Sequence, residues 1–181
     1  MASSLVRGKY VICKVNNRNQ AHVIEDGAVF DGPSLVAGFT ERGRTLVGIM
    51  TNGLCLWRPG AAGSHLNFSI PPRVPLLLAD IWGVPYAVRP DEQSCAVGRE
   101  DGRVEVWRLT DGVQVASWAA HKGAVKAVAF SKDGLRLATA VDEARIWDFE
   151  TRREILRLGQ TNWPANCLAF SPDGAFLAGS A

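Results

Sequence analysis

Apolar residues recur at every second position in several short runs of the chain. Residues 104–107 (Val-Glu-Val-Trp), 113–116 and 135–138 alternate apolar residues with polar or small ones, which is the pattern of half-buried β-strands. Asp-Gly pairs, which suit tight turns between antiparallel strands, separate the runs at 101–102, 111–112, 133–134 and 173–174. No window has a long run of apolar residues at helical three-four spacing. The pattern predicts an all-β protein of short antiparallel strands.

These strands recur at a fixed stride. The segment 124–138 returns as 164–178, so that Phe130 corresponds to Phe170, and the same separation joins Trp107 to Trp147. A stride of about 40 residues falls within the range of repeat proteins. Four strands fit into a unit of this length, and one such sheet cannot cover both of its own faces. It must stack against similar neighbours.

The repeated residues resemble a known family. The pair Trp147-Asp148, preceded by His121 and by Ala-Phe-Ser-Lys-Asp-Gly at 129–134, resembles a repeat of the WD-repeat (tryptophan-aspartate repeat) β-propeller family. Residues 101–107 are similar to the family's end-of-third-strand pattern, although Arg108 stands where that pattern has Asp. The resemblance implies a partial or small β-propeller of four-stranded antiparallel blades, about four repeats in number, with the last one incomplete.

The repeat spacing sets the expected blade boundaries. Residues 1–32 are predicted to form a degenerate partial blade and residues 33–181 the propeller blades, at about 33–70, 80–118, 119–158 and, truncated, 159–181. Three arrangements fit this count. The chain is a fragment of a longer protein, or strands from 10–31 complete the last blade of a small ring, or two chains associate through open blade edges to make a full ring.

The resemblance also implies a buried polar relay within one blade. Family blades often join a His before the first strand, a Ser or Thr in the second, an Asp in the following turn and the Trp of the third. Here these residues are His121, Thr139, Asp142 and Trp147. Such a network is structural, because it satisfies buried donors and acceptors. We therefore interpret His121 as a scaffold histidine rather than a catalytic base.

The leading functional hypothesis is a non-catalytic scaffold that mediates protein–protein interactions through propeller loops. Strands hold such loops rigidly, so partners dock with little loss of entropy. The candidate partner-binding residues are large or charged residues expected in loops: Arg99, Glu100, Lys122, Glu143 and Trp163. We expect other proteins or peptides as partners, together with self-association through open blade edges.

Composition excludes several other classes of function. With 20 Lys+Arg and 18 Asp+Glu the net charge is only +2, and scattered basic residues give no footprint for nucleic acid. The longest apolar stretch, 74–88, is interrupted by Pro and Asp, so no membrane interaction is predicted. The four cysteines form no Cys-x-x-Cys pair, and no secretory signal is visible. We expect reduced thiols and a cytoplasmic location, with the nucleus as the alternative.

The alternative hypothesis is a metal-dependent hydrolase. Residues 7–12 and 23–30 are similar to the opening strands of metal-dependent amidohydrolases, which would next show a metal-binding His-x-His. The chain lacks that motif, and its histidines, His22, His65 and His121, are far apart in sequence. We therefore predict no catalytic residues, no metal site, no cofactor and no enzymatic activity.

Overall fold

Every element that the structure describes is a β-strand. A computed structural model describes residues 12–15, 21–24, 34–39, 45–50, 53–57, 65–68, 85–158 and 166–180, and these contain no helix. The prediction of an all-β chain with four-stranded antiparallel sheets is confirmed. The chain divides into two compact units, Met1–Leu78 and Ala79–Ala181, and each is described by itself.

The first unit contains two antiparallel sheets. Strands β1 (Ile12–Val15) and β2 (Ala21–Ile24) pair with each other. A four-stranded sheet follows in the order β3-β4-β5-β6, from β3 (Ser34–Phe39), β4 (Leu46–Met50), β5 (Gly53–Trp57) and β6 (His65–Phe68). The assignment of residues 1–32 to a degenerate blade stays a prediction.

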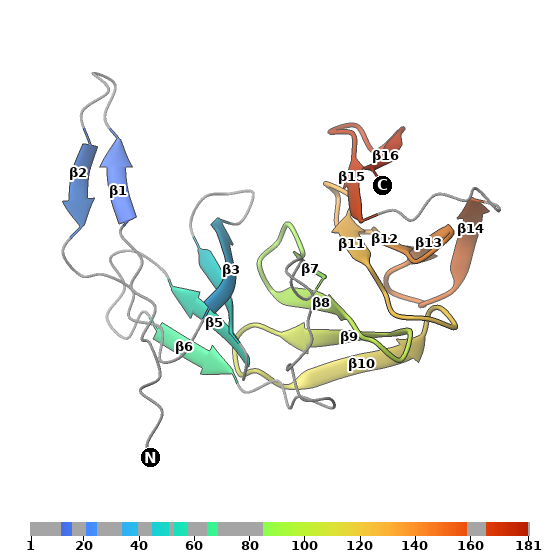
Figure 1. Ribbon diagram of the computed structural model, residues 1–181, viewed down its shortest axis with the longest axis horizontal. Coiled ribbons are helices and arrows are strands. Elements are labelled where there is room, and N and C mark those ends of the chain that lie inside the picture. Colours follow the sequence, from blue (N-terminus) through green and yellow to red (C-terminus); the bar gives the residue numbers. More distant parts are fainter. Residues whose placement is uncertain are drawn as a thin grey trace, which may run out of the picture. The chain divides into compact units, whose positions relative to one another are not determined.

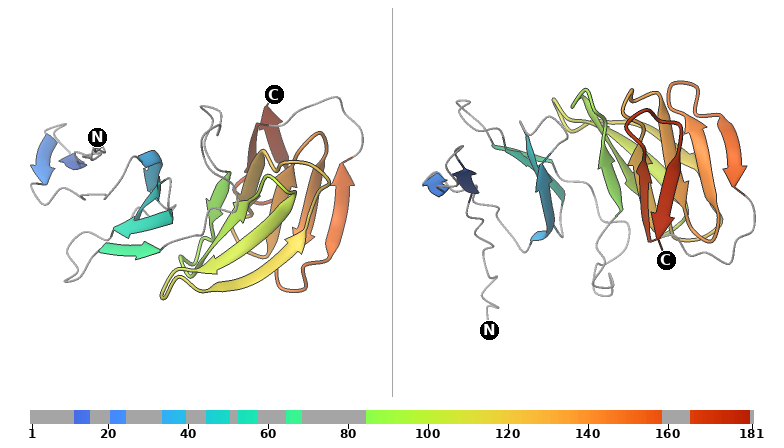
Figure 2. Two further views of the ribbon diagram at one scale, coloured as in Figure 1. Left: turned by 60° about the horizontal axis from the view of Figure 1, so that its bottom comes forward. Right: turned by 90° about the horizontal axis from the view of Figure 1, so that it is seen from above.

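The second unit repeats one up-and-down sheet along the chain (Figures 1 and 2). The first sheet contains β7 (Tyr86–Val88), β8 (Ser94–Gly98), β9 (Arg103–Arg108) and β10 (Gln114–Ala119). The second contains β11 (Ala127–Phe130), β12 (Arg136–Ala140), β13 (Ala144–Asp148) and β14 (Glu154–Leu158). A two-stranded sheet follows, made of β15 (Cys167–Phe170) and β16 (Leu177–Ser180). Consecutive sheets contact each other through their first strands: β11 contacts β7 of the preceding sheet and β15 of the following one. It also contacts β8.

Two turns within these sheets, β11–β12 and β15–β16, have the sequence Ser-x-Asp-Gly. In the β11–β12 turn the Asp133 carboxylate accepts a hydrogen bond from the Leu135 backbone N–H at 2.9 Å, and Gly134 has a φ of 70°. The β15–β16 turn repeats this arrangement one stride later with Asp173, and there Gly174 has a φ of 68°. Glycine adopts this left-handed region without steric strain, so the predicted Asp-Gly turns are confirmed here.

The core lies between consecutive sheets. One cluster joins the β7–β10 and β11–β14 sheets and contains Ala96, Val104, Ala120, Val125, Val128, Phe130, Leu137 and Trp147. Trp118, at the end of β10, packs edge-on against Trp147 with their ring centroids 5.9 Å apart. A second cluster, including Ala138 and Leu168, joins the β11–β14 and β15–β16 sheets. Within the second unit, each sheet therefore buries a face against the next one along the chain.

Candidate functional site

The up-and-down strand order gives the β7–β14 region two distinct ends. One end, which we call the His121 end, carries the β8–β9 turn, the β12–β13 turn and the β10–β11 connection. The opposite end, which we call the Arg152 end, carries the β7–β8, β9–β10, β11–β12 and β13–β14 turns. The predicted partner-binding residues that the structure describes, Arg99, Glu100, Lys122 and Glu143, belong to segments of the His121 end.

Three predicted relay residues meet near the His121 end. The Trp147 indole Nε1–H donates a hydrogen bond to Thr139 Oγ1 at 2.9 Å, and His121 Nε2 lies 2.8 Å from the same oxygen. Thr139 is fully buried, and His121 and Trp147 are nearly so. A hydroxyl can accept from an indole and donate to an unprotonated imidazole nitrogen. The three side chains thus join β12, β13 and the β10–β11 connection.

His121 is uncharged at neutral pH. Burial, together with the positive charge of Arg145, lowers the pKa of its imidazole to about 4, against the opposing carboxylates of Glu143 and Glu154. The imidazole is enclosed and already bonded to Thr139. This environment suits a structural histidine better than a proton-transfer group, which needs a pKa near the working pH.

Asp142, the fourth residue of the expected relay, lies apart from the other three. Its side chain is 82% exposed, and its carboxylate lies 3.7 Å from Lys126 Nζ. The β12–β13 turn offers only residues 141–143 between the strands, whereas the β8–β9 turn has four, 99–102. The shorter turn directs Asp142 into solvent, which corrects the expectation that it closes the relay.

The β7–β10 sheet carries a different buried polar cluster, which the sequence analysis did not identify. The Glu105 side chain is only 2% exposed, and its carboxylate lies 3.0 Å from Arg99 Nε. Trp107 Nε1–H donates to the same carboxylate oxygen at 3.3 Å. In register, Glu105 opposes Val97 just as Arg145 opposes Thr139. Positions 105 and 145 correspond in the repeat but carry opposite charges. This difference is the sequence feature from which the cluster could have been predicted.

The five predicted partner-binding residues fall into three groups. Glu100 and Lys122 are exposed. Arg99 and Glu143 are instead held against their sheets: Arg99 is 17% exposed and paired with Glu105, and Glu143 is paired with Arg145. Trp163 lies outside the described residues. Among the described candidates, only Glu100 and Lys122 present exposed side chains to a partner.

Backbone hydrogen bonds fix the segments that carry Glu100 and Lys122. The Ala120 and His121 N–H groups donate to the Gly102 carbonyl at 3.0 and 2.9 Å, and the Val125 N–H donates to the Arg99 carbonyl at 3.0 Å. Gly102 has a φ of 81°, and a Cβ atom there would lie 2.1 Å from the His121 carbonyl oxygen. The two segments are therefore fastened together across neighbouring sheets, through a position that accepts only glycine.

Two searches of the described part of the chain bear on other functions. It contains no group of three or more His, Cys, Asp or Glu side chains placed to hold a metal ion. It also has no helix with the length and hydropathy needed to cross a membrane. The expectation that the whole protein has no metal or cofactor stays a prediction.

Comparisons with known proteins agree with the repeat pattern. The family model described as "WD domain, G-beta repeat" (WD40) matches residues 112–148 and 153–181. The chain is 32% identical over 92 residues to pre-mRNA-processing factor 19 homolog 2 of Arabidopsis thaliana, and 27% identical over 92 residues to human WD repeat and SOCS box-containing protein 1. It is 32% identical over 98 residues to an uncharacterised WD repeat-containing protein of Synechocystis.

The similarity covers part of each protein. The matched segments are 50%, 48% and 52% of this chain, but only 17%, 22% and 28% of the respective relatives. None of these matches supports the hydrolase alternative. The repeat stride, the tryptophan positions and the antiparallel sheets agree with the family model, and residues 112–148 and 153–181 of this chain therefore match WD40 repeats.

Proposed function

We propose that this protein is a non-catalytic scaffold that binds other proteins through the His121 end of its blades. The observation that carries the proposal is the hydrogen-bonded junction between the β8–β9 turn and the β10–β11 connection. It presents the exposed side chains of Glu100 and Lys122 from a backbone that is already ordered. A partner that docks on such a surface loses little entropy in ordering it.

The polar chemistry of this end supports a binding role over catalysis. The imidazole of His121 is buried, bonded to Thr139 and of lowered pKa. The carboxylates of Glu105 and Glu143 are neutralised by Arg99 and Arg145. These groups hold the blades together, which leaves the exposed charges for recognition. Stoichiometric zinc, iron or manganese in the purified protein would instead favour the hydrolase alternative.

A position-specific cross-linking experiment tests the proposed face. A photoreactive phenylalanine analogue is introduced at Glu100, at Lys122 or, as a control, at Lys132, which is exposed in the β11–β12 turn of the opposite end. We expect discrete cross-linked proteins in cell extract from positions 100 and 122 and none of the same species from position 132. Equal products from all three positions, or none from 100 and 122, would reject this face.

We also propose self-association through open sheet edges. Strand β14 ends the order of its sheet, and all of its residues are exposed, including Ile155, Leu156 and Leu158. Exposed apolar edge strands favour pairing with another chain. Sedimentation equilibrium should give a mass of about twice 19.6 kDa at high concentration, and a mass of 19.6 kDa at every concentration would contradict this.

We place the protein in the cytoplasm, with the nucleus as the alternative location. Cys95 and Cys167 are free thiols, which suits a reducing compartment. Microscopy of the fluorescently tagged protein in its own cells would decide between the two compartments.

A further inference from the structure

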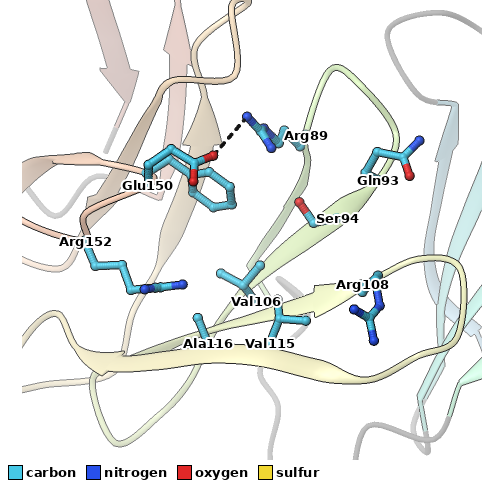
Figure 3. Close-up of a pocket in the computed structure, with 10 residues that line it drawn as sticks. Arg89, Gln93, Ser94, Val106, Arg108, Val115, Ala116, Glu150 and Arg152 are labelled. Carbon is cyan, nitrogen blue, oxygen red and sulfur yellow. Dashed lines mark ion pairs between the residues drawn. The ribbon is translucent and has the colours of Figure 1, made fainter.

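A pocket opens at the Arg152 end, between the β7–β10 sheet and the β13–β14 turn. Its volume is about 240 Å³, smaller than the roughly 300–1,000 Å³ typical of sites for drug-sized ligands. Its apolar lining residues are Val106, Val115, Ala116 and Phe149, and its charged ones are Arg89, Arg108, Arg152 and Glu150. Figure 3 shows these side chains. The size suits a single side chain with part of its neighbour.

All three rim arginines depart from the internal repeat. Arg108 corresponds to Asp148 and Arg152 to Gly112, each at the distance that separates Trp107 from Trp147. Arg89 begins the β7–β8 turn at the place that Ser131 holds in the β11–β12 turn, because Glu92 N–H donates to the Arg89 carbonyl as Gly134 N–H donates to the Ser131 carbonyl. The neighbouring blade closes the same turns without these arginines, so the fold does not require them.

Arg152 also keeps a conformation that glycine would adopt without strain. Its φ is 58°, and its N–H donates to the Asp148 carbonyl at 2.8 Å. Gly112, with a φ of 69°, makes the equivalent bond to Arg108 at 2.9 Å. Residues with a Cβ atom are strained in this region of backbone space. A side chain retained despite that strain suggests a role for the side chain itself.

Arg152 is the arginine of the pocket whose side chain has no partner among the described residues. The Arg89 guanidinium is held by Asp91 and Glu150 and lies over the Phe149 ring. Arg108 Nε donates to both carboxylate oxygens of Asp111 at 2.9 Å. Within residues 85–158 and 166–180, the Arg152 side chain has no ion pair or hydrogen bond. It extends toward Val106 and Ala116 (Figure 3).

The apolar wall includes an exposed side chain that the strand aims outward. In β10, Gln114 pairs with Trp107 and Ala116 with Val106, which leaves Val115 as the extra residue of a bulge. Bulges re-aim side chains and often occur beside functional sites. Val115 is 44% exposed, so it can receive an aliphatic group from a ligand whose charged group reaches Arg152.

We propose that this pocket binds an acidic side chain of a partner protein, with the carboxylate on Arg152 and a neighbouring aliphatic side chain against Val115. One unpaired guanidinium matches one carboxylate, and its planar fork binds both oxygens. A phosphoryl group carries nearly two charges and would leave one of them unmatched, which favours the carboxylate. The site deepens the proposed protein-binding role but lies at the opposite end from Glu100 and Lys122.

Nuclear magnetic resonance titration tests this site on the whole ¹⁵N-labelled chain. The probes are blocked Leu-Glu-Leu, Leu-Gln-Leu and Leu-phosphoserine-Leu peptides at millimolar concentration. We expect the glutamate peptide to shift resonances of the β13–β14 turn and of β10, and to bind at least about tenfold more tightly than the glutamine peptide. Arg152→Gly should abolish that preference and still fold, because Gly112 adopts the same conformation.

The matched control is Arg153→Ala, which removes the same charge from an exposed neighbour that does not line the pocket. It should change the affinity by less than about twofold. Equal binding of the glutamate and glutamine peptides, no binding of either, equal losses in the two variants, or tighter binding of the phosphoserine peptide would each overturn the carboxylate assignment. Cross-linking from Glu100 and Lys122 is independent of these outcomes, so either proposal can fail alone.

Discussion

The hydroxyl of Thr139 is the hydrogen-bond partner of two buried side chains in the β11–β14 sheet. The Thr139→Val substitution removes this hydroxyl with almost no change in side-chain shape. The substitution leaves Trp147 Nε1–H and His121 Nε2 without the oxygen that lies 2.9 and 2.8 Å from them. Each buried polar group left unpaired costs about 1–3 kcal/mol. We therefore expect the free energy of unfolding to fall by about 2–6 kcal/mol.

The neighbouring sheet explains why valine is harmless in one blade and costly in the other. Val97 holds the corresponding position there, and Trp107 donates to Glu105 instead. In the β11–β14 sheet the residue opposite position 139 is Arg145, and a guanidinium cannot accept a hydrogen bond. No substitute acceptor therefore stands opposite position 139.

Urea and thermal unfolding, followed by tryptophan fluorescence, measure this effect. A loss of about 2 kcal/mol should lower the melting temperature of a unit of this size by about 8 °C or more. Thr139→Ser keeps the hydroxyl and should lose only about 1 kcal/mol. In a Trp147→Phe background, Thr139→Val should cost less, because one of the orphaned groups is gone. A Thr139→Val protein within about 0.5 kcal/mol of the wild type would refute the reasoning.

Three further predictions concern the described residues. Because burial lowers the pKa of His121 to about 4, the unfolded chain binds the proton more tightly. The free energy of unfolding should therefore fall by about 2 kcal/mol from pH 7 to pH 5. The His121→Gln variant should lose most of this pH dependence. If the variant keeps it, His121 is not its cause. Gly102→Ala should destabilise the fold by more than about 2 kcal/mol through its left-handed φ and its contact with the His121 carbonyl. Gly112 lies in a turn where the next blade has Arg152, so Gly112→Ala should cost only about 1 kcal/mol. If urea unfolding gives the same loss of stability for both variants, the contact between Gly102 and the His121 carbonyl does not matter. Burial raises the pKa of Cys95 to about 12, whereas Cys167 is exposed. Iodoacetamide at pH 8 should therefore label Cys167 before Cys95, as mass spectrometry of the peptides would detect. Faster labelling of Cys95 would disprove its burial.

Local sequence features predicted the strands and turns because their causes are local. Alternation within residues 135–138 places Leu137 in the core, and the Asp133-Gly134 pair closes its turn by a bond to the next backbone N–H. The His121–Thr139–Trp147 contact followed from a resemblance to a family whose repeats share that geometry. The expected place of Asp142 in the relay was wrong, because a turn that is one residue shorter changes the direction of its side chain.

The features that the sequence analysis missed depend on pairing between distant segments. Glu105 lies in an alternating Val-Glu-Val run, which predicts an exposed carboxylate, and it is buried because Arg99 reaches it from across the turn. The Arg152 pocket needs the β13–β14 turn of one sheet to lie against the previous sheet. Only the stacking of the blades brings Arg152 and Val115 together.

Amide hydrogen exchange at the junction of the two sheets tests the central claim most directly, namely that consecutive WD40-type blades lock into one rigid surface. The N–H groups of Ala120, His121 and Val125 donate across that junction to Gly102 and Arg99. We predict that these three amides exchange as slowly as those in the centre of β12. Exchange at the rate of an unprotected loop would contradict the claim.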